Sequence, residues 1–179
     1  MALLKTGHFA RLGFTRLHVA GHPEGNRDID TDGSNTAVDA ALRWKQDFAR
    51  ETGIDMAIAT QFVFQAGPVT DWIARLRRNG IDLPVHVGIA GPAKLQTLLK
   101  FAIACGVGPS MKVLQKRAMD VSKLLLPYEP DSFLEALAAE KAANPAFGIE
   151  SVHFFPLGGI RTNAEWTHRH GQRPMRVAA

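Results

Sequence analysis

Apolar, strand-like runs alternate with helix-like segments along this chain, and that alternation limits its possible folds more than any other feature. The strand-like runs are Thr15–Ala20, Met56–Thr60 with its continuation to Phe64, Pro84–Ile89 and Ser151–Phe155. Helical patterns cover about 36–51, 69–79, 92–104, 110–126 and 131–143, and a last helix begins near Asn163. Strand–helix–strand units of about 30 residues imply parallel strands joined by right-handed crossovers. The sequence therefore predicts an α/β fold.

The length of the chain sets how much of such a fold is present. Three clear strand–helix units and a fourth, less regular one occupy the 179 residues. A complete eight-stranded β/α barrel typically needs about 250 residues. We therefore expect one incomplete domain over residues 1–179, a partial (half) TIM-type β/α barrel of about four βα units with parallel strands, and a disordered tail over 168–179.

Charge and composition exclude several classes of function. The net charge of +4 is scattered, whereas nucleic-acid-binding proteins concentrate basic side chains on one face. No apolar run reaches the ~18 residues of a membrane span, and the first residues lack the apolar segment of a signal peptide. The single cysteine, Cys105, excludes an intrachain disulfide and a cysteine-based zinc site. We expect a cytoplasmic protein with no nucleic-acid, membrane or metal partner.

Functional side chains of parallel α/β folds lie at the carboxyl ends of the strands. After the first strand, His22 and Glu24 could form an acid–base pair, or could hydrogen-bond their own loop. After the second strand, Gln61 carries a donor and an acceptor, which suits the edge of a heterocycle or a buried backbone partner. Lys45 and Phe101 lie on helical patterns, where a surface lysine and a core phenylalanine are the simpler interpretations. P-loop, GxGxxG, GxSxG and HExxH motifs do not occur.

Four motifs in series give the chain a resemblance to a known family: VAGHPEGN (19–26), ATQFVF (59–64), VHVGIAGPAKLQTLLKFA (85–102) and VHFFPLGG (152–159). Together they resemble the second half of methylenetetrahydrofolate reductase, over residues from about 10 to 160. The resemblance implies a flavin-dependent eight-stranded α/β barrel with FAD and NAD(P)H as cofactors. The implied reaction is the reduction of 5,10-methylenetetrahydrofolate to 5-methyltetrahydrofolate, a step of one-carbon and methionine metabolism.

On the flavin side, the resemblance implies contacts from Ala20, His22, Glu24 and Lys45. His22 stands where the family has a tyrosine, within a YPE-type motif that the next two residues match. Ala20 falls at a strand end that contacts the flavin. Lys45 corresponds more loosely to a lysine that helps hold FAD, because the segment before Gly53 differs in length.

On the substrate side, the resemblance implies three further contacts. Gln61 matches the glutamine that hydrogen-bonds the pterin of folate. Phe101 matches a phenylalanine that packs against folate or nicotinamide in turn, and Leu157 matches an apolar residue of the same pocket. A second glutamine that the family often places on the helix after GI-x-x-P is Thr97 here.

The general acid of the family lies on its first four strands, and this chain begins close to the fifth. No catalytic residue is therefore assigned, and whether this chain alone is an enzyme is left open. We expect a carboxyl-terminal fragment of such a reductase. The alternatives are a non-catalytic folate- or flavin-binding remnant, a half-barrel that pairs with another copy as a homo-oligomer, and a barrel enzyme that uses tetrahydrofolate without flavin.

Overall fold

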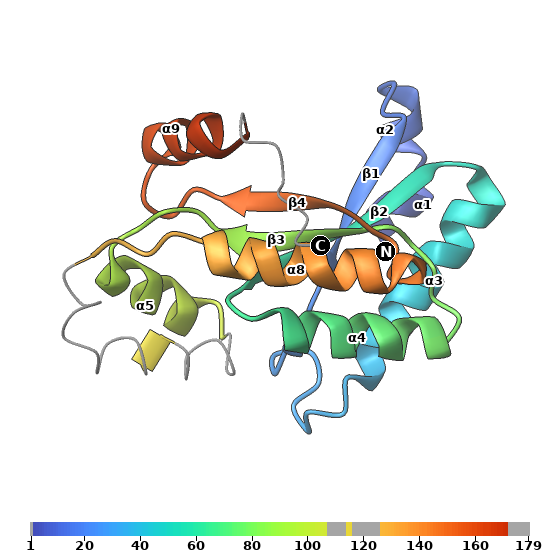
Figure 1. The fold of residues 1–179 in the computed structure, drawn as a ribbon. Helices are drawn as coiled ribbons and strands as arrows, with labels where there is room; N and C mark the ends of the chain where they lie inside the picture. The colour runs from blue at the N-terminus through green and yellow to red at the C-terminus, as the bar shows by residue number, and fades with distance from the viewer. Residues whose placement is uncertain (1, 107–113, 116–125, 172–179) are drawn as a thin grey trace.

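A computed structural model of the chain describes residues 2–106, 114–115 and 126–171 (Figure 1). Its centre is a four-stranded, all-parallel sheet in the order β1-β2-β3-β4. The strands are β1 (Arg16–Gly21), β2 (Asp55–Val63), β3 (Val85–Ala90) and β4 (Ile149–Phe155). Each begins within two residues of its expected position, so the predicted α/β fold with parallel strands is confirmed.

Helices occupy the connections between the strands. They are α3 (Thr36–Thr52), α4 (Ala66–Arg78), α5 (Leu95–Ala104) and α8 (Asp131–Ala143), followed by the short 3₁₀ helix η1 (Pro145–Phe147) and, after β4, α9 (Ile160–Gly171). Most of the helix expected over 110–126 lies outside the described residues. Helix α9 includes residues 168–171, the first part of the tail expected over 168–179, and the rest of that tail lies outside the described residues. Among the described residues, no helix combines the length and the apolar composition that crossing a membrane requires.

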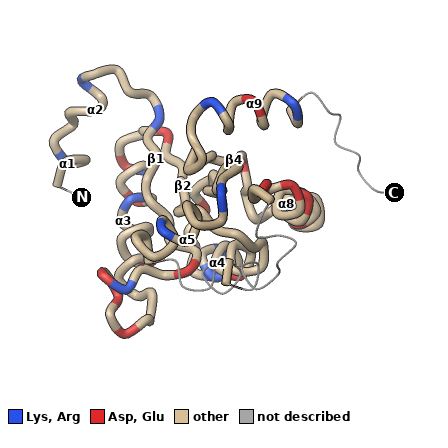
Figure 2. Tube along the Cα trace, turned by 90° about the vertical axis from the view of Figure 1, so that its left-hand side faces the viewer, with Lys and Arg blue, Asp and Glu red and all other residues tan. Residues whose placement is uncertain are grey.

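Three helices cover one face of the sheet. Figure 2 shows α3, α4 and α8 in an arc on one side of the strands. The alternate residues Val85, Val87 and Ile89 of β3 point to this side and are completely buried. Trp72 of α4 packs among them, and a Cβ atom on Gly21 would lie 3.0 Å from its ring. We call this layer the helix-side core.

The other face of the sheet is less covered. His18, Ala20, Ser151 and His153 are exposed there, while Ala59 and His86 are half-buried. We call it the open face. The guanidinium of Arg16 on β1 and the carboxylate of Glu150 on β4 form an ion pair of 2.5 Å across it. The sheet is curved, because Cα atoms of β2 and β4 come within 8 Å of each other, whereas strands two spacings apart in a flat sheet would stand about 9.5 Å apart.

A smaller core lies beyond the carboxyl ends of the strands. Phe62 of β2 and Phe64, just after the strand, pack there against α5, whose Leu98 and Ala102 are buried. An isolated bridge between Ala93 and Tyr128 ties the segment before α5 to the segment before α8. We call this the α5 cluster.

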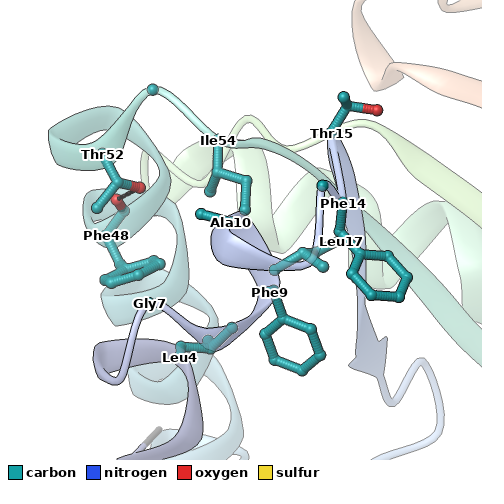
Figure 3. Close-up of a pocket in the computed structure, with 12 residues that line it drawn as sticks. Leu4, Gly7, Phe9, Ala10, Phe14, Thr15, Leu17, Phe48, Thr52 and Ile54 are labelled. Atoms are coloured by element: carbon teal, nitrogen blue, oxygen red, sulfur yellow. Dashed lines mark hydrogen bonds between the residues drawn. The ribbon is translucent and has the colours of Figure 1, made fainter.

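Two short helices, α1 (Ala2–Lys5) and α2 (His8–Arg11), precede β1 and were not expected from the sequence. They lie beside the amino ends of the strands and the end of α3. A cavity of about 500 Å³ lies there. Figure 3 shows Phe9, Phe14 and Leu17 among its lining residues, together with Phe48 and Ile54. This apolar cavity is at the opposite end of the sheet from the residues that the sequence singles out.

Arg77 fastens the amino ends of β3 and β4. Its guanidinium donates hydrogen bonds to the carbonyl oxygens of Ile81 (2.5 Å), Leu83 (3.1 Å) and Phe147 (2.5 Å). Burial lowers the pKa of Arg77. Gly148 has a φ of +66°, and a Cβ atom there would lie 2.7 Å from the guanidinium. One side chain thus closes two loops that enter neighbouring strands.

Candidate functional site

His22 lies directly after β1, at the carboxyl end of the sheet. Its side chain is half-buried, and its Nδ1 atom is buried without a hydrogen-bond partner among the described residues. Burial lowers the pKa of His22, a side-chain hydrogen bond with Gln61 opposes that effect, and the nearby charge of Lys45 adds to it. The imidazole is therefore held neutral near pH 7, with one ring nitrogen left over for a ligand.

Gln61 comes from the neighbouring strand, β2, and is also half-buried. Its hydrogen bond to His22 joins the two residues that the sequence placed at the ends of adjacent strands. A primary amide has one acceptor oxygen and two N–H donors, so this bond leaves further hydrogen-bonding capacity. The structure thus brings together the implied flavin-side histidine and the implied folate-side glutamine.

Lys45 reaches this region from the middle of α3. The side chain is half-buried, burial lowers the pKa of its ammonium group, and no carboxylate pairs with it in the described part of the chain. Its charge acts on His22. A half-buried ammonium without a counter-ion is suited to an anionic group of a ligand.

Small side chains form the floor beside these polar groups. Ala20 of β1 and Ala59 of β2 are paired in register, and Ala20 is exposed on the open face. Next to these alanines, the ring centroids of His18 and His86 are 4.6 Å apart. Two alanines side by side leave a flat, apolar area that a planar ring can cover.

Glu24 is half-buried in the loop that follows His22. That loop turns back at once, because the N–H of Gly25 donates to the carbonyl of His22 at 3.0 Å. Gly25 has a φ of +80°, a conformation that favours glycine. The turn keeps Glu24 close to His22 in the chain.

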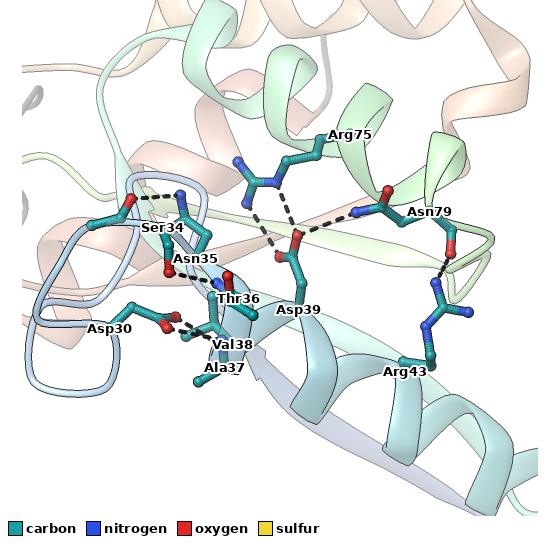
Figure 4. Close-up of polar contacts among 11 residues, drawn as sticks. Asp30, Ser34, Asn35, Thr36, Ala37, Val38, Asp39, Arg43, Arg75 and Asn79 are labelled. Atoms are coloured by element: carbon teal, nitrogen blue, oxygen red, sulfur yellow. Dashed lines mark hydrogen bonds and ion pairs between the residues drawn. The ribbon is translucent and has the colours of Figure 1, made fainter.

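Asp30, which the sequence analysis did not select, anchors the same loop. Its buried carboxylate accepts the backbone N–H groups of Ala37 (2.8 Å) and Val38 (3.0 Å), in the first turn of α3 (Figure 4). Ser34 accepts the N–H of Thr36 at 3.2 Å, while Asn35 has a φ of +61° and no side-chain capping bond. Local capping rules look one to three residues ahead, so a cap seven residues away gives no signal in the sequence.

The two remaining implied site residues lie on or beside the α5 cluster, also beyond the carboxyl ends of the strands. Phe101 is on α5 and is 37% exposed. Leu157, after β4, is half-buried and packs against the α5 cluster. The site that the structure assembles therefore consists of His22, Gln61 and Lys45 beside Ala20, with Glu24 in the adjoining loop.

A second polar cluster lies on the open face toward the amino ends of the strands. Glu150 accepts hydrogen bonds from His86 and Arg16, each at 2.5 Å, and these bonds lower the pKa of Glu150. Arg16 also pairs with Asp55 at 3.2 Å. Within residues 2–106, 114–115 and 126–171, no group of three or more histidine, cysteine, aspartate or glutamate side chains could hold a metal ion.

Fold and site together define an α/β protein with a polar site at the carboxyl ends of a parallel sheet. No protein-family model matches the chain. Any narrower assignment rests on the motifs and on the geometry of His22, Gln61 and Lys45.

Proposed function

We propose that this chain forms the carboxyl-terminal half of a flavin-dependent β/α barrel and binds FAD and a reduced folate, as the resemblance to methylenetetrahydrofolate reductase implies. The observation that carries the proposal is the register of β1 and β2: Gly21 pairs with Thr60, so His22 and Gln61 follow side by side, next to the paired Ala20 and Ala59. The motifs assign these residues separately to flavin and pterin, and the two ligands must meet face to face for hydride transfer.

The residues present fit a flavin. The paired alanines offer a flat area for the ring, the free Nδ1 of His22 offers a hydrogen-bonding atom, and Lys45 offers a positive charge for phosphate. A bound flavin would supply the hydride chemistry with NAD(P)H, and this chain's own groups would hold and orient the rings. Neutral His22 can donate or accept one hydrogen bond at the ring edge, according to its tautomer.

Flavin binding is tested by placing a larger side chain at Ala20, on the flat area proposed to hold the ring. FAD is titrated into the purified chain and its fluorescence is followed. We expect binding by the wild type and a loss of at least tenfold in affinity for Ala20→Leu, because the added side chain occupies the ring area. Ser151→Leu is the matched control, since Ser151 is also exposed on the open face but lies on β4. Equal affinities of wild type and Ala20→Leu would contradict the proposed flavin position, and no binding by wild type would contradict flavin use.

Folate binding is tested at Gln61. In the presence of FAD, 5-methyltetrahydrofolate is titrated into wild type and Gln61→Leu. Loss of both amide hydrogen bonds should weaken folate binding by about tenfold or more, at about 1 kcal/mol or more for each bond, while FAD affinity changes less. An equal loss for both ligands would remove the folate assignment of Gln61.

One observation favours a second candidate, a subunit that binds without turnover until a second half-barrel covers it. Parallel sheets are almost always covered on both faces. In the described residues β1 and β4 each pair on one side only, and His18 and His153 stay exposed on the open face. Light scattering distinguishes the two cases: a dimer whose dissociation by dilution abolishes FAD binding supports the paired half-barrel, and a monomer that binds FAD contradicts it.

A further inference from the structure

Strand β2 contains an irregularity at the residues that give the site its glutamine. Ala59 pairs with His86, but Phe62 pairs with Gly88, so the register shifts by one residue in between. Two residues of β2, Thr60 and Gln61, therefore stand opposite the single intervening residue of β3. This arrangement is a β-bulge, which is rare in parallel pairs.

The alternation of side chains along β2 changes at the same point. Met56 and Ile58 pack into the helix-side core, as residues two apart in a strand should. Val63 packs into the same core, although it is five residues beyond Ile58, whereas Phe62 packs into the α5 cluster. The extra residue has reversed which positions face the helices, and Gln61 lies within the reversal.

Thr60 supplies the hydrogen bonds that hold the bulge. Its side-chain hydroxyl accepts the N–H of Gly88 at 2.8 Å and donates to the carbonyl of Gln61 at 2.7 Å. Thr60 is 1% exposed, so both bonds are shielded from water. The hydroxyl thus does on β2 what a backbone carbonyl would do in a regular ladder.

Gly88 provides the space that the bulge occupies. A Cβ atom on Gly88 would lie 2.3 Å from the carbonyl oxygen of Thr60 and 2.6 Å from that of Gln61. Any other residue would force the two strands apart at this point. The bulge therefore needs both the hydroxyl of Thr60 and the absence of a side chain at Gly88.

We infer that Thr60 is a positioning residue: its buried hydroxyl fixes the β2 bulge that presents the side chain of Gln61 to His22 at the mouth of the sheet. The inference concerns the residues of the chain alone and does not depend on which ligand binds. Where the proposed function also holds, the hydroxyl of Thr60 sets the orientation of the Gln61 amide that hydrogen-bonds the pterin ring.

Two variants of Thr60 test the inference. In each, the pKa of His22 is measured by NMR titration of the intact chain without ligand. Thr60→Val keeps the shape of the side chain and removes the hydroxyl, and Thr60→Ser keeps the hydroxyl. The amide oxygen of Gln61, as acceptor of the His22 ring N–H, raises the pKa of His22 against burial and Lys45. We therefore expect Thr60→Val to lower the pKa of His22 by as much as Gln61→Leu does, and Thr60→Ser to leave it unchanged.

A folded Thr60→Val variant with the wild-type pKa at His22 would overturn the inference, and so would an equal shift in Thr60→Ser. A measurement on the wild type covers the case in which Thr60→Val does not fold. Nuclear Overhauser contacts are expected between the Gln61 side-chain amide and the His22 ring, and between the Gly88 amide and the Thr60 side chain. The absence of either contact overturns the inference, whatever ligands the protein binds.

Discussion

The two ends of the sheet are built differently. At the amino ends, charged groups are paired: Arg16 with Glu150 and Asp55, and Arg77 with three carbonyl oxygens. At the carboxyl ends, Lys45 has no carboxylate partner in the described part of the chain and His22 keeps a buried ring nitrogen without a hydrogen bond. Uncompensated polar groups cost stability, so a fold keeps them where a ligand can complete them.

The difference extends to how the backbone is held. The amino end is fixed by an arginine that closes two loops, and the cavity beside it is lined by apolar side chains. The carboxyl end is fixed from inside, by the buried carboxylate of Asp30 under its loop and by the buried hydroxyl of Thr60 in its bulge. These anchors leave the surface of the site free for binding. We therefore assign stability to the amino end and recognition to the carboxyl end.

The largest effect should follow from disturbing the amino end. We expect Arg77→Ala to lower the free energy of unfolding by about 3 kcal/mol, because three part-buried carbonyl oxygens lose a charged donor. Urea denaturation measures this value. Arg78→Ala is the control, since Arg78 is exposed at the end of the same helix. If Arg77→Ala lowers the free energy of unfolding as little as Arg78→Ala does, the side chain of Arg77 does not stabilise the amino end of the sheet.

The second effect concerns the carboxyl end. We expect Asp30→Ala to cost about 1–2 kcal/mol, the usual cost of removing a helix cap. Asp30→Asn retains an acceptor oxygen and should lose less. Hydrogen exchange should also speed up for the loop 22–35 while β3 stays protected, because Asp30 fixes the loop to α3. If exchange of β3 increases as much as that of the loop, Asp30 supports the whole fold rather than its carboxyl end.

The sequence predicted the strands well, because the apolar runs Met56–Phe64 and Pro84–Ile89 have the length and β-branched content of buried parallel strands. It also placed His22 and Gln61 at the carboxyl ends of two strands, and these strands are neighbours in the sheet. The bulge at Thr60 was not predictable, because a change of register depends on the partner strand. Nor was the cap by Asp30, because the contact is made across a loop of irregular backbone.

The third prediction compares His18, on the open face, with His22, at the carboxyl end of the sheet. Burial is the main cause that lowers the pKa of both His18 and His22, but His18 also faces His86, Arg16 and His153, with Glu150 opposing them. Salt screens exposed charges much more than it changes burial. Raising the salt from 0.1 to 1 M should therefore raise the pKa of His18 more than that of His22, as NMR titration would show.

These shifts have a sign in stability. A histidine whose pKa is lower in the folded protein than the ordinary 6.5 binds protons more readily when unfolded. Stability should therefore fall as the pH drops from about 6.5 through the lowered values. His22→Gln should flatten this part of the profile. An equal salt response of His18 and His22 would mean that charge, rather than burial, sets the pKa of His22 and would weaken the contrast between the two ends.

The smallest effect should come from Glu150. Its pKa is lowered first by the hydrogen bond from His86 and then by that from Arg16. The stabilisation is therefore present above the ordinary carboxyl pKa of 4.5 and is lost as the pH falls through the lowered value. Because the carboxylate is exposed to solvent and screened, Glu150→Gln should change stability at pH 7 less than Arg77→Ala or Asp30→Ala does. It should instead remove part of the loss measured by urea denaturation between pH 4.5 and pH 3. An unchanged acid profile in Glu150→Gln would mean that the contacts of Glu150 with His86 and Arg16 contribute nothing to stability in this pH range.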